Sequence, residues 1–264
     1  MSSSNLHERE ADYYAERVDR DMEEHLSIDE FSERQKFALT CQYLGMEGHG
    51  SGIITQMTAR GQQDGTFITM PFGFGFEDVR EQDLLLMDYD LKTIEGRGMS
   101  NPAQRFQMWI YDKRPDVNCI IHAHSPHVSA YSMLDEPFHV AHMDAAFFNE
   151  DVAWLRDWPG LPISDDEGKL ISAALGNKRS ILLANHGYLV AAATIEEAAV
   201  LAVYMERGAR TLLMAKAAGK LNPVNPEMAR SAHNFLLSKP FVGASFNYFA
   251  RRVLEKSPDC ISSK

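Results

Sequence analysis

The chain has 264 residues, of which 45% are hydrophobic and 24% are charged, and its formal net charge is −11. This composition is typical of a soluble globular protein, and it excludes global disorder and a disulfide-stapled miniprotein. The acidic balance argues against nonspecific nucleic-acid binding, which needs a basic face. Residues 1–9 lack the apolar core of a secretory signal, and no apolar run reaches the length of a membrane span. The three cysteines are widely spaced, which is typical of a protein from a reducing compartment. Together with the acidic charge and the short apolar runs, this predicts a cytoplasmic protein without nucleic-acid or membrane partners.

The first part of the chain predicts two helices followed by short strands. Residues 5–25 are charged and favour a helix that lies as a peripheral arm. A second helix is predicted from Asp29 to about Leu44, and the glycines on either side of His49 end its pattern. Alternating apolar residues then predict strands over 53–57, 65–70 and 84–88, and 93–96 closes a hairpin.

The rest of the chain mixes helices and strands. Its predicted helices cover 102–112, 126–134 and 165–175, its predicted strands cover 117–122, 180–184 and 188–193, and 135–163 is irregular. A capping box from Thr194 to Glu197 opens a long helix to about Lys216, and two helical segments split near Pro240 fill 224–256. Without repeats or a GxGxxG motif, this mixture indicates one α/β domain around a mostly antiparallel or mixed sheet.

Three histidines follow apolar runs that are typical of buried strands. His122 and His124 end one run, and residues two apart point to the same face of a strand. His186 ends another run, and Gly187 after it permits a tight turn. Three neutral imidazoles at strand ends can hold a divalent metal and leave a position open for substrate or water. The alternative is that each histidine has only a structural role.

A wider set of motifs resembles the class II aldolase and adducin family over most of residues 30–220. The motifs are Pro71-Phe72-Gly73, Asp83-Leu84-Leu85 and Asp88, then Arg114-Pro115-Asp116-Val117-Asn118 and His122-Ala123-His124-Ser125-Pro126, then Leu183-Ala184-Asn185-His186-Gly187 and Thr194-Ile195-Glu196-Glu197-Ala198. The resemblance implies an α/β/α sandwich with a central, mostly antiparallel sheet. It divides the chain into an N-terminal helical arm (1–28), the family domain (29–220) and a C-terminal helical extension (221–264).

The resemblance also implies a metal site and an assembly. It places His122, His124 and His186 on the family's metal ligands, and it implies one divalent ion, which can be zinc, manganese or iron. It implies a homo-oligomer, often a tetramer, with active sites at subunit interfaces and a small-molecule substrate. Because the cytoskeletal adducin branch lacks an intact ligand set, the three histidines favour an enzyme over an interaction module.

The chain departs from the family's sugar-phosphate aldolases where they bind phosphate and move a proton. Their Ser-Ser-Glu motif corresponds here to Asn101, Pro102 and Ala103, so both the serines and the acid/base carboxylate are replaced. Their phosphate loop is altered in residues 51–55, and their catalytic tyrosine corresponds to Met143. A phosphorylated substrate would therefore lose its anion-binding groups in this chain.

These differences favour chemistry that needs no carboxylate base at position 103. We expect a metal-dependent lyase that cleaves a carbon–carbon bond of a non-phosphorylated hydroxy- or oxo-acid, with decarboxylation ahead of retro-aldol cleavage. An aromatic acid would suit a pocket lined by some of the chain's many phenylalanines. A mononuclear non-heme iron oxygenase is the alternative, because a branch of the family oxygenates prenylated hydroxybenzoate-type acids. An adducin-like module without enzyme activity is the second alternative.

Three further residues are candidates for roles around the metal. His142 is predicted to replace the missing acid/base, and a structural hydrogen bond involving Asp144 is the alternative. Arg105 is predicted to pair with a substrate carboxylate, and packing on the helix flank is its alternative. His49 is predicted to line the substrate pocket, and an ordinary loop role is its alternative.

Overall fold

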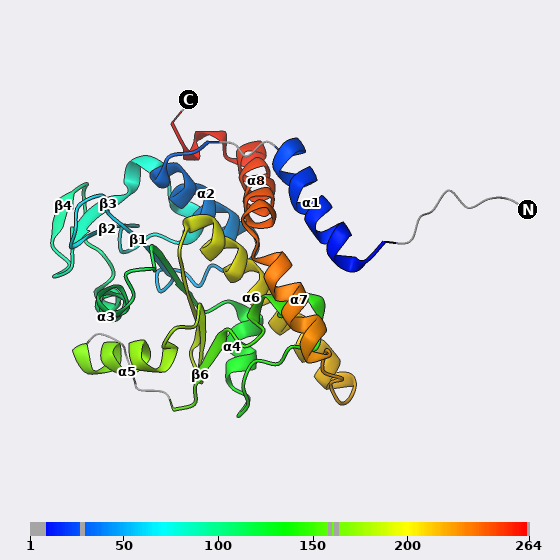
Figure 1. The fold of residues 1–264 in the computed structure, drawn as a ribbon. Coiled ribbons are helices and arrows are strands. Elements are labelled where there is room, and N and C mark those ends of the chain that lie inside the picture. The colour runs from blue at the N-terminus through cyan, green and yellow to red at the C-terminus, as the bar shows by residue number, and fades with distance from the viewer. Residues whose placement is uncertain (1–8, 27–29, 158–159, 161–163, 263–264) are drawn as a thin grey trace, which may run out of the picture.

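The computed structural model describes the chain except for residues 1–8, 27–29, 158–159, 161–163 and 263–264. Its centre is an eight-stranded sheet in the order β4-β3-β2-β1-β5-β8-β7-β6 (Figure 1). The strands are β1 (Gln56–Arg60), β2 (Thr66–Thr69), β3 (Leu85–Asp88), β4 (Thr93–Glu95), β5 (Cys119–Ala123), β6 (Val152–Leu155), β7 (Ser180–Leu183) and β8 (Gly187–Ala192). Neighbouring strands are antiparallel except β6 and β7, so the predicted mostly antiparallel sheet is confirmed.

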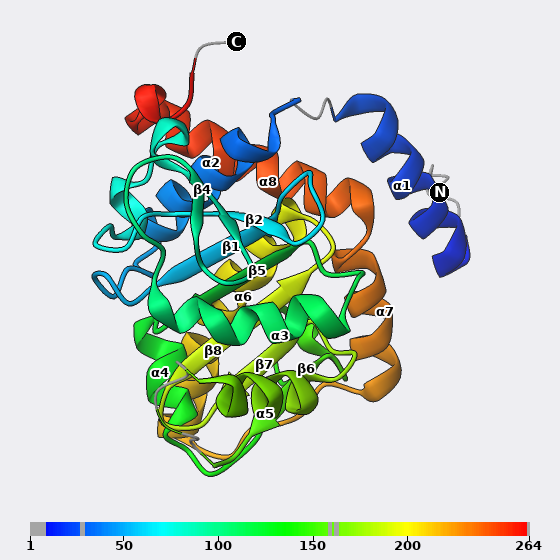
Figure 2. The same ribbon diagram turned by 90° about the vertical axis from the view of Figure 1, so that its left-hand side faces the viewer.

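Helices cover both faces of this sheet. Figure 2 shows α3 (Arg105–Lys113) and α5 (Asp165–Leu175) crossing one face. The other face carries α2 (Glu33–Met46), α4 (Pro126–Ser132) and α6 (Ile195–Ala218), which pack against one another or against the central strands. The predicted α/β/α sandwich is therefore confirmed.

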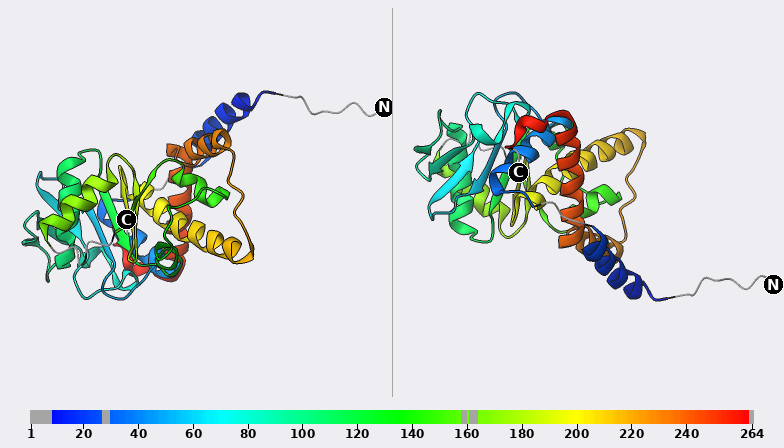
Figure 3. Two further views of the ribbon diagram at one scale, coloured as in Figure 1. Left: turned by 90° about the horizontal axis from the view of Figure 1, so that it is seen from below. Right: turned by 90° about the horizontal axis from the view of Figure 1, so that it is seen from above.

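Three helices lie outside the sandwich. α8 (Lys239–Lys256) packs on α2 and α6, and α7 (Pro226–Leu236) packs beside α8. α1 (Ala11–His25) lies beside α8 and projects away from the body of the molecule (Figure 3). Within the described residues, every helix is too short or too polar to cross a membrane. The division of the chain at residues 28 and 220 remains a prediction.

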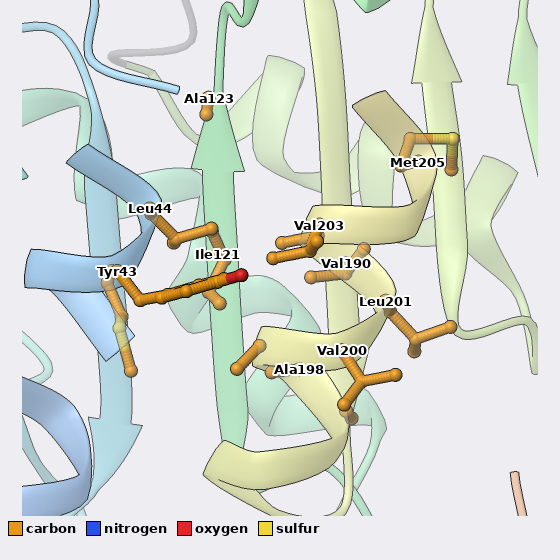
Figure 4. Close-up of a cluster of buried hydrophobic side chains, with 14 of the residues drawn as sticks. Tyr43, Leu44, Ile121, Ala123, Val190, Ala198, Val200, Leu201, Val203 and Met205 are labelled. Carbon is orange, nitrogen blue, oxygen red and sulfur yellow. The ribbon is translucent and has the colours of Figure 1, made fainter. Parts of the chain in front are cut away.

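The side chains of β5 point alternately to the two faces of the sheet, so this strand contributes both to the hydrophobic core and to the candidate site. Cys119, Ile121 and Ala123 are buried in the larger hydrophobic cluster, between the sheet and α2, α4, α6 and α8. Figure 4 shows Ile121 among side chains from α2, β8 and α6. Ile120 belongs to the second cluster, under α3 and α5, and His122 shares its face because the side chains of a strand alternate.

Some predicted elements differ from the structure. The stretch 135–163 contains β6 and the short 3-10 helix Met143–Phe148, so the prediction that it is irregular was incomplete. β1 begins at Gln56, not at Ile53. α2 begins at Glu33, because the Ser32 side chain accepts from the backbone N–H of Gln35 and forms a capping box.

Candidate metal centre

The structure brings His122, His124 and His186 together at one end of the paired strands β5 and β8. One nitrogen of each imidazole lies within 4.8 Å of the corresponding nitrogens of the other two. The Nε2 atoms of His122 and His124 are 3.0 Å apart, and the ring centroids of His124 and His186 are 4.6 Å apart. His122 is buried, while His124 and His186 are partly exposed. The convergence that the sequence predicts from two separate motifs is therefore present in the fold.

The ring of His122 is fixed on two sides. Its Nδ1–H donates to the backbone carbonyl of Tyr188 on β8, at 2.8 Å. This bond leaves Nε2 as the unprotonated nitrogen, directed at His124. The ring packs in a T-shaped contact with the ring of Phe106 on α3, with centroids 5.5 Å apart and planes near perpendicular. One imidazole lone pair is thus aimed at the other two histidines before any ligand arrives.

Burial keeps all three imidazoles neutral. Desolvation lowers the pKa of His122 well below the ordinary value of 6.5, and the neighbouring His186 and His124 lower it further. Burial, followed by the proximity of His124, lowers the pKa of His186 to about 4. Burial also lowers the pKa of His124. Neutral imidazole is the form that binds a metal, so the cluster suits a cation at neutral pH.

A strained turn carries His186 between β7 and β8. Asn185 has φ 56°, a left-handed conformation that asparagine tolerates better than most residues. Its N–H donates to the carbonyl of Ser132 at the end of α4. A Cβ atom on Gly187 would lie 2.5 Å from the carbonyl oxygen of Ala123 and 2.9 Å from His124. Gly187 therefore allows the end of β5 and its histidine to approach the turn closely.

The donors of the histidine cluster are three imidazoles. Among the residues that the structure describes, no Asp or Glu joins the three histidines as a further ligand in this group. Ala103 lies in the 3-10 turn Pro102–Gln104, one turn before Phe106, and Asn101 caps that turn through its side chain. A methyl group thus stands at the position where the resemblance predicts the aldolase carboxylate.

Arg105 is occupied by other groups in this chain. Its Nε donates to Asp165 at 2.8 Å, and one terminal nitrogen donates to the carbonyl of Tyr89 at 2.8 Å. These bonds tie the start of α3 to the start of α5 and to the loop after β3. The substrate-binding role predicted for Arg105 remains a prediction, and the contacts in the structure support its structural alternative.

His49 and His142 lie on the side of the sheet covered by α6. His49 is 1% exposed, and its Nδ1 shares a 3.0 Å hydrogen bond with the hydroxyl of Tyr188. It lines a polar pocket of about 290 Å³ together with Glu206 of α6. His142 is exposed, and its Nδ1 accepts from the backbone N–H of Asp144, the structural bond given as its alternative. The catalytic and substrate-binding roles of these two residues remain predictions.

Three contacts around the ligands were not predicted from the sequence. They are the Tyr188 carbonyl on His122, the Phe106 ring beside it, and the Ser51 hydroxyl, which donates to the carbonyl of His124 at 3.0 Å. Each depends on a pairing of segments distant in the chain. The one usable signal was Tyr188, which lies two residues after His186, in the apolar strand that follows the turn.

Comparison with known proteins shows which proteins this chain is similar to. The sequence model described as the class II aldolase and adducin N-terminal domain matches residues 35–213. The chain is 30% identical to decarboxylase NovR of Streptomyces niveus over 219 residues, which cover 82% of this chain and 80% of that protein. It is 29% identical to the 4-hydroxy-3-prenylphenylpyruvate oxygenase/4-hydroxy-3-prenylbenzoate synthase of Streptomyces roseochromogenus subsp. oscitans, over 82% of this chain and 78% of that one.

A solved structure has a similar fold. The L-fuculose 1-phosphate aldolase of Glaciozyma antarctica PI12 superposes with a TM-score of 0.80 over 87% of this chain and 92% of that chain, at 24% sequence identity. At that identity the likeness concerns the fold, which agrees with the eight-stranded sandwich described above.

Proposed function

The chain belongs to the class II aldolase and adducin family, and from that premise we propose that it is a metal-dependent lyase acting on a non-phosphorylated hydroxy- or oxo-acid. The reaction cleaves a carbon–carbon bond, with decarboxylation ranked ahead of aldol cleavage. His122, His124 and His186 hold the metal, and the favoured substrate class is an aromatic acid. The working assembly is a homo-oligomer, a tetramer, with active sites at its interfaces.

The observation that carries the proposal is a donor set of three imidazoles without a carboxylate. In the described part of the chain, no Asp or Glu joins the cluster, and Ala103 offers no base. Aldol cleavage needs a base to remove a hydroxyl proton from the substrate. Decarboxylation needs no such base, because CO2 leaves from a carboxylate that is already ionised. The donor set therefore suits decarboxylation better.

The chemistry of the three side chains fits a metal ion. The bond from His122 to the Tyr188 carbonyl leaves Nε2 free to coordinate, and burial keeps the other two rings neutral. A bound divalent ion would supply Lewis-acid stabilisation of the electron pair left on the substrate. The Phe106 ring packs in a T-shaped contact with the His122 ring, which is buried.

His142 is the proposed proton donor to the carbanion that decarboxylation leaves. It is exposed on the side of the sheet covered by α6, whereas the ring of His122 faces α3. We therefore assign it to the site of a neighbouring subunit, consistent with active sites at interfaces. This role requires the oligomer.

The name of one relative supports an aromatic acid and also defines the second candidate. One relative is named a decarboxylase, and the other is named for an oxygenase that acts on a prenylated hydroxyphenylpyruvate. The oxygenase is therefore the second candidate function. It ranks lower because the common iron triad of such enzymes includes a carboxylate, which this cluster lacks.

The deciding experiment measures CO2 release and oxygen uptake by protein loaded with zinc, manganese or iron. The panel contains aromatic hydroxy- and oxo-acids, with L-fuculose 1-phosphate as the phosphorylated comparison. We expect CO2 release without oxygen uptake from at least one acid, and no cleavage of the sugar phosphate. Iron-dependent oxygen uptake would replace the lyase by the oxygenase. A protein that binds no metal and turns over no acid would leave the adducin-like module.

Single variants connect that activity to the named residues. His122→Ala and His186→Ala should lose metal and activity while keeping the fold, because each removes one of three ligands. His142→Gln should keep its metal and lose turnover. His139→Ala is the matched control, since His139 lies beside Glu136 and should behave as wild type. Metal analysis, circular dichroism and the CO2 assay provide the readouts, and full metal content in either ligand variant would contradict the assignment.

A further inference from the structure

We propose that Glu206 is a positioning residue for the metal ligand His124, acting through the backbone that follows it. The inference rests on the proposed three-histidine centre. Glu206 belongs to α6 and is 7% exposed. It lies in the helical layer on the α6 side of the sheet, whereas the ring of His122 packs under α3.

Both oxygens of the Glu206 carboxylate accept hydrogen bonds from the first turn of α4. Its Oε1 accepts from the backbone N–H of His127 at 3.0 Å and from His127 Nδ1 at 2.6 Å. Its Oε2 accepts from the backbone N–H of Val128 at 2.9 Å. Hydrogen bonds to an ionised acceptor are stronger than neutral ones, so this contact holds the turn firmly. Although burial opposes ionisation, the bonds from the backbone of His127 and Val128 lower the pKa of Glu206.

The hydrogen bonds to Glu206 take the place of an N-terminal helix cap, which the residues next to α4 do not provide. Ser125 occupies the N-cap position of α4, but its side chain makes no capping bond. Pro126 lacks an N–H, so the first two backbone donors of the helix are those of His127 and Val128. Both donors point to Glu206, which comes from a helix distant in the chain. The first two N–H groups of α4 are therefore satisfied by a carboxylate of α6 and not by the side chain of the N-cap residue.

The fixed turn lies directly after His124. β5 ends at Ala123, and His124 and Ser125 form the whole connection to α4. The carbonyl of His124 also accepts from the Ser51 hydroxyl at 3.0 Å. The backbone of His124 is thus held from the strand before it, from the loop beside it and from the helix after it. Displacing the α4 turn would move the imidazole relative to His122 and His186.

Glu206 and His127 also permit another interpretation, a catalytic dyad facing the polar pocket. Both residues line that pocket with His49. The positioning role depends on the two backbone donors, whereas a dyad depends on the imidazole of His127. Removing that imidazole while keeping the backbone separates the two interpretations.

The test measures binding of Co²⁺ and Zn²⁺, each added alone, to the full chain and its variants. Glu206→Ala should bind both ions 10- to 100-fold more weakly, the usual effect of removing a group that orients a ligand. It should also change the visible spectrum of the Co²⁺ form at saturation, which reports ligand geometry. Glu206→Gln, which keeps one acceptor oxygen, should fall between Glu206→Ala and wild type. Ser51→Ala removes the hydrogen bond to the carbonyl of His124 and should also weaken metal binding. Because this variant removes no buried charge, it provides a second measurement if Glu206→Ala fails to fold.

Two controls define what would overturn the proposal. Glu197→Gln changes another α6 carboxylate that accepts a backbone N–H, from Ala193, and should bind metal as wild type does. His127→Ala should bind both ions as wild type does, because the main-chain donors to Glu206 remain. If Glu206→Ala and Ser51→Ala both fold and keep the wild-type metal affinity and spectrum, the positioning role is refuted and the proposed function stands. Loss of turnover in His127→Ala at unchanged metal affinity would favour the dyad. A wild-type chain that binds neither ion would refute the proposed function together with this inference.

Discussion

His49 is buried without a charged partner bonded to it, and this has a cost at acid pH. Burial lowers its pKa to about 4, although the nearby Glu206 opposes part of that effect. In the unfolded chain the same imidazole has an ordinary pKa near 6.5. Between these values the unfolded state binds the proton more readily than the folded state. His49 therefore destabilises the fold as the pH falls from about 6.5 to about 4.

Replacing this imidazole should flatten the acid dependence of stability. His49→Gln keeps a polar side chain near the Tyr188 hydroxyl but binds no proton. Between pH 6.5 and pH 4, the free energy of unfolding should fall less steeply in the variant, by up to ~1.4 kcal/mol per pH unit. Denaturant titrations of both proteins in EDTA check this, because the other histidines are then the same in each. Parallel stability curves across that range would contradict the expectation.

The contact between α3 and α5 shows a steric requirement at the scale of elements. Gly168 lies within α5, and a Cβ atom there would lie 2.4 Å from the Trp109 ring and 3.1 Å from the Cα of Phe106. Because the Phe106 ring also contacts His122, the separation of these two helices bears on the metal centre. The glycine permits the close packing of the layer that covers the site.

Gly168→Ala tests which of two opposing effects is larger. Helix propensity alone would make the substitution stabilising by roughly 1 kcal/mol. Overpacking against the Phe106 backbone should outweigh this and give a net loss of about 1–3 kcal/mol. Gly219→Ala at the end of α6 is the control, since no atom lies within 4 Å of its added Cβ and its φ is extended. Chemical denaturation measures both, and a stabilised Gly168→Ala would show that the layer can relax.

Elements and site residues with local sequence signals could be predicted, whereas those that depend on distant contacts could not. α5 was predicted with its observed bounds because its limits are local, with Ser164 capping its start and Gly176 ending it. The convergence of His122, His124 and His186 was predictable because each follows an apolar run, and their role as metal ligands remains a proposal. β6 was missed because its four residues become a strand only by pairing with β7. Glu206 was missed because its partners are distant in the chain, and no local pattern indicates that contact.

At the scale of the whole molecule, the three-histidine cluster depends on the central strand pair β5 and β8. Ile121 lies opposite Val190, and between these strands the chain forms α4, β6, α5 and β7. His122 and His186 meet only when this distant pair has formed and the turn before β8 is in place. The full set of three histidines cannot assemble from neighbouring residues alone, because His122 and His124 lie at the end of β5 and His186 lies in the turn before β8.

This arrangement has a kinetic consequence. Contacts between distant segments form late in folding, because loop closure must precede them. A metal that needs both β5 and the turn before β8 should bind the native state and not the transition state for folding. Stopped-flow measurements should therefore show that Zn²⁺ slows unfolding in proportion to its occupancy and leaves the refolding rate unchanged. Faster refolding with Zn²⁺ would mean that the histidines converge before the sheet is complete.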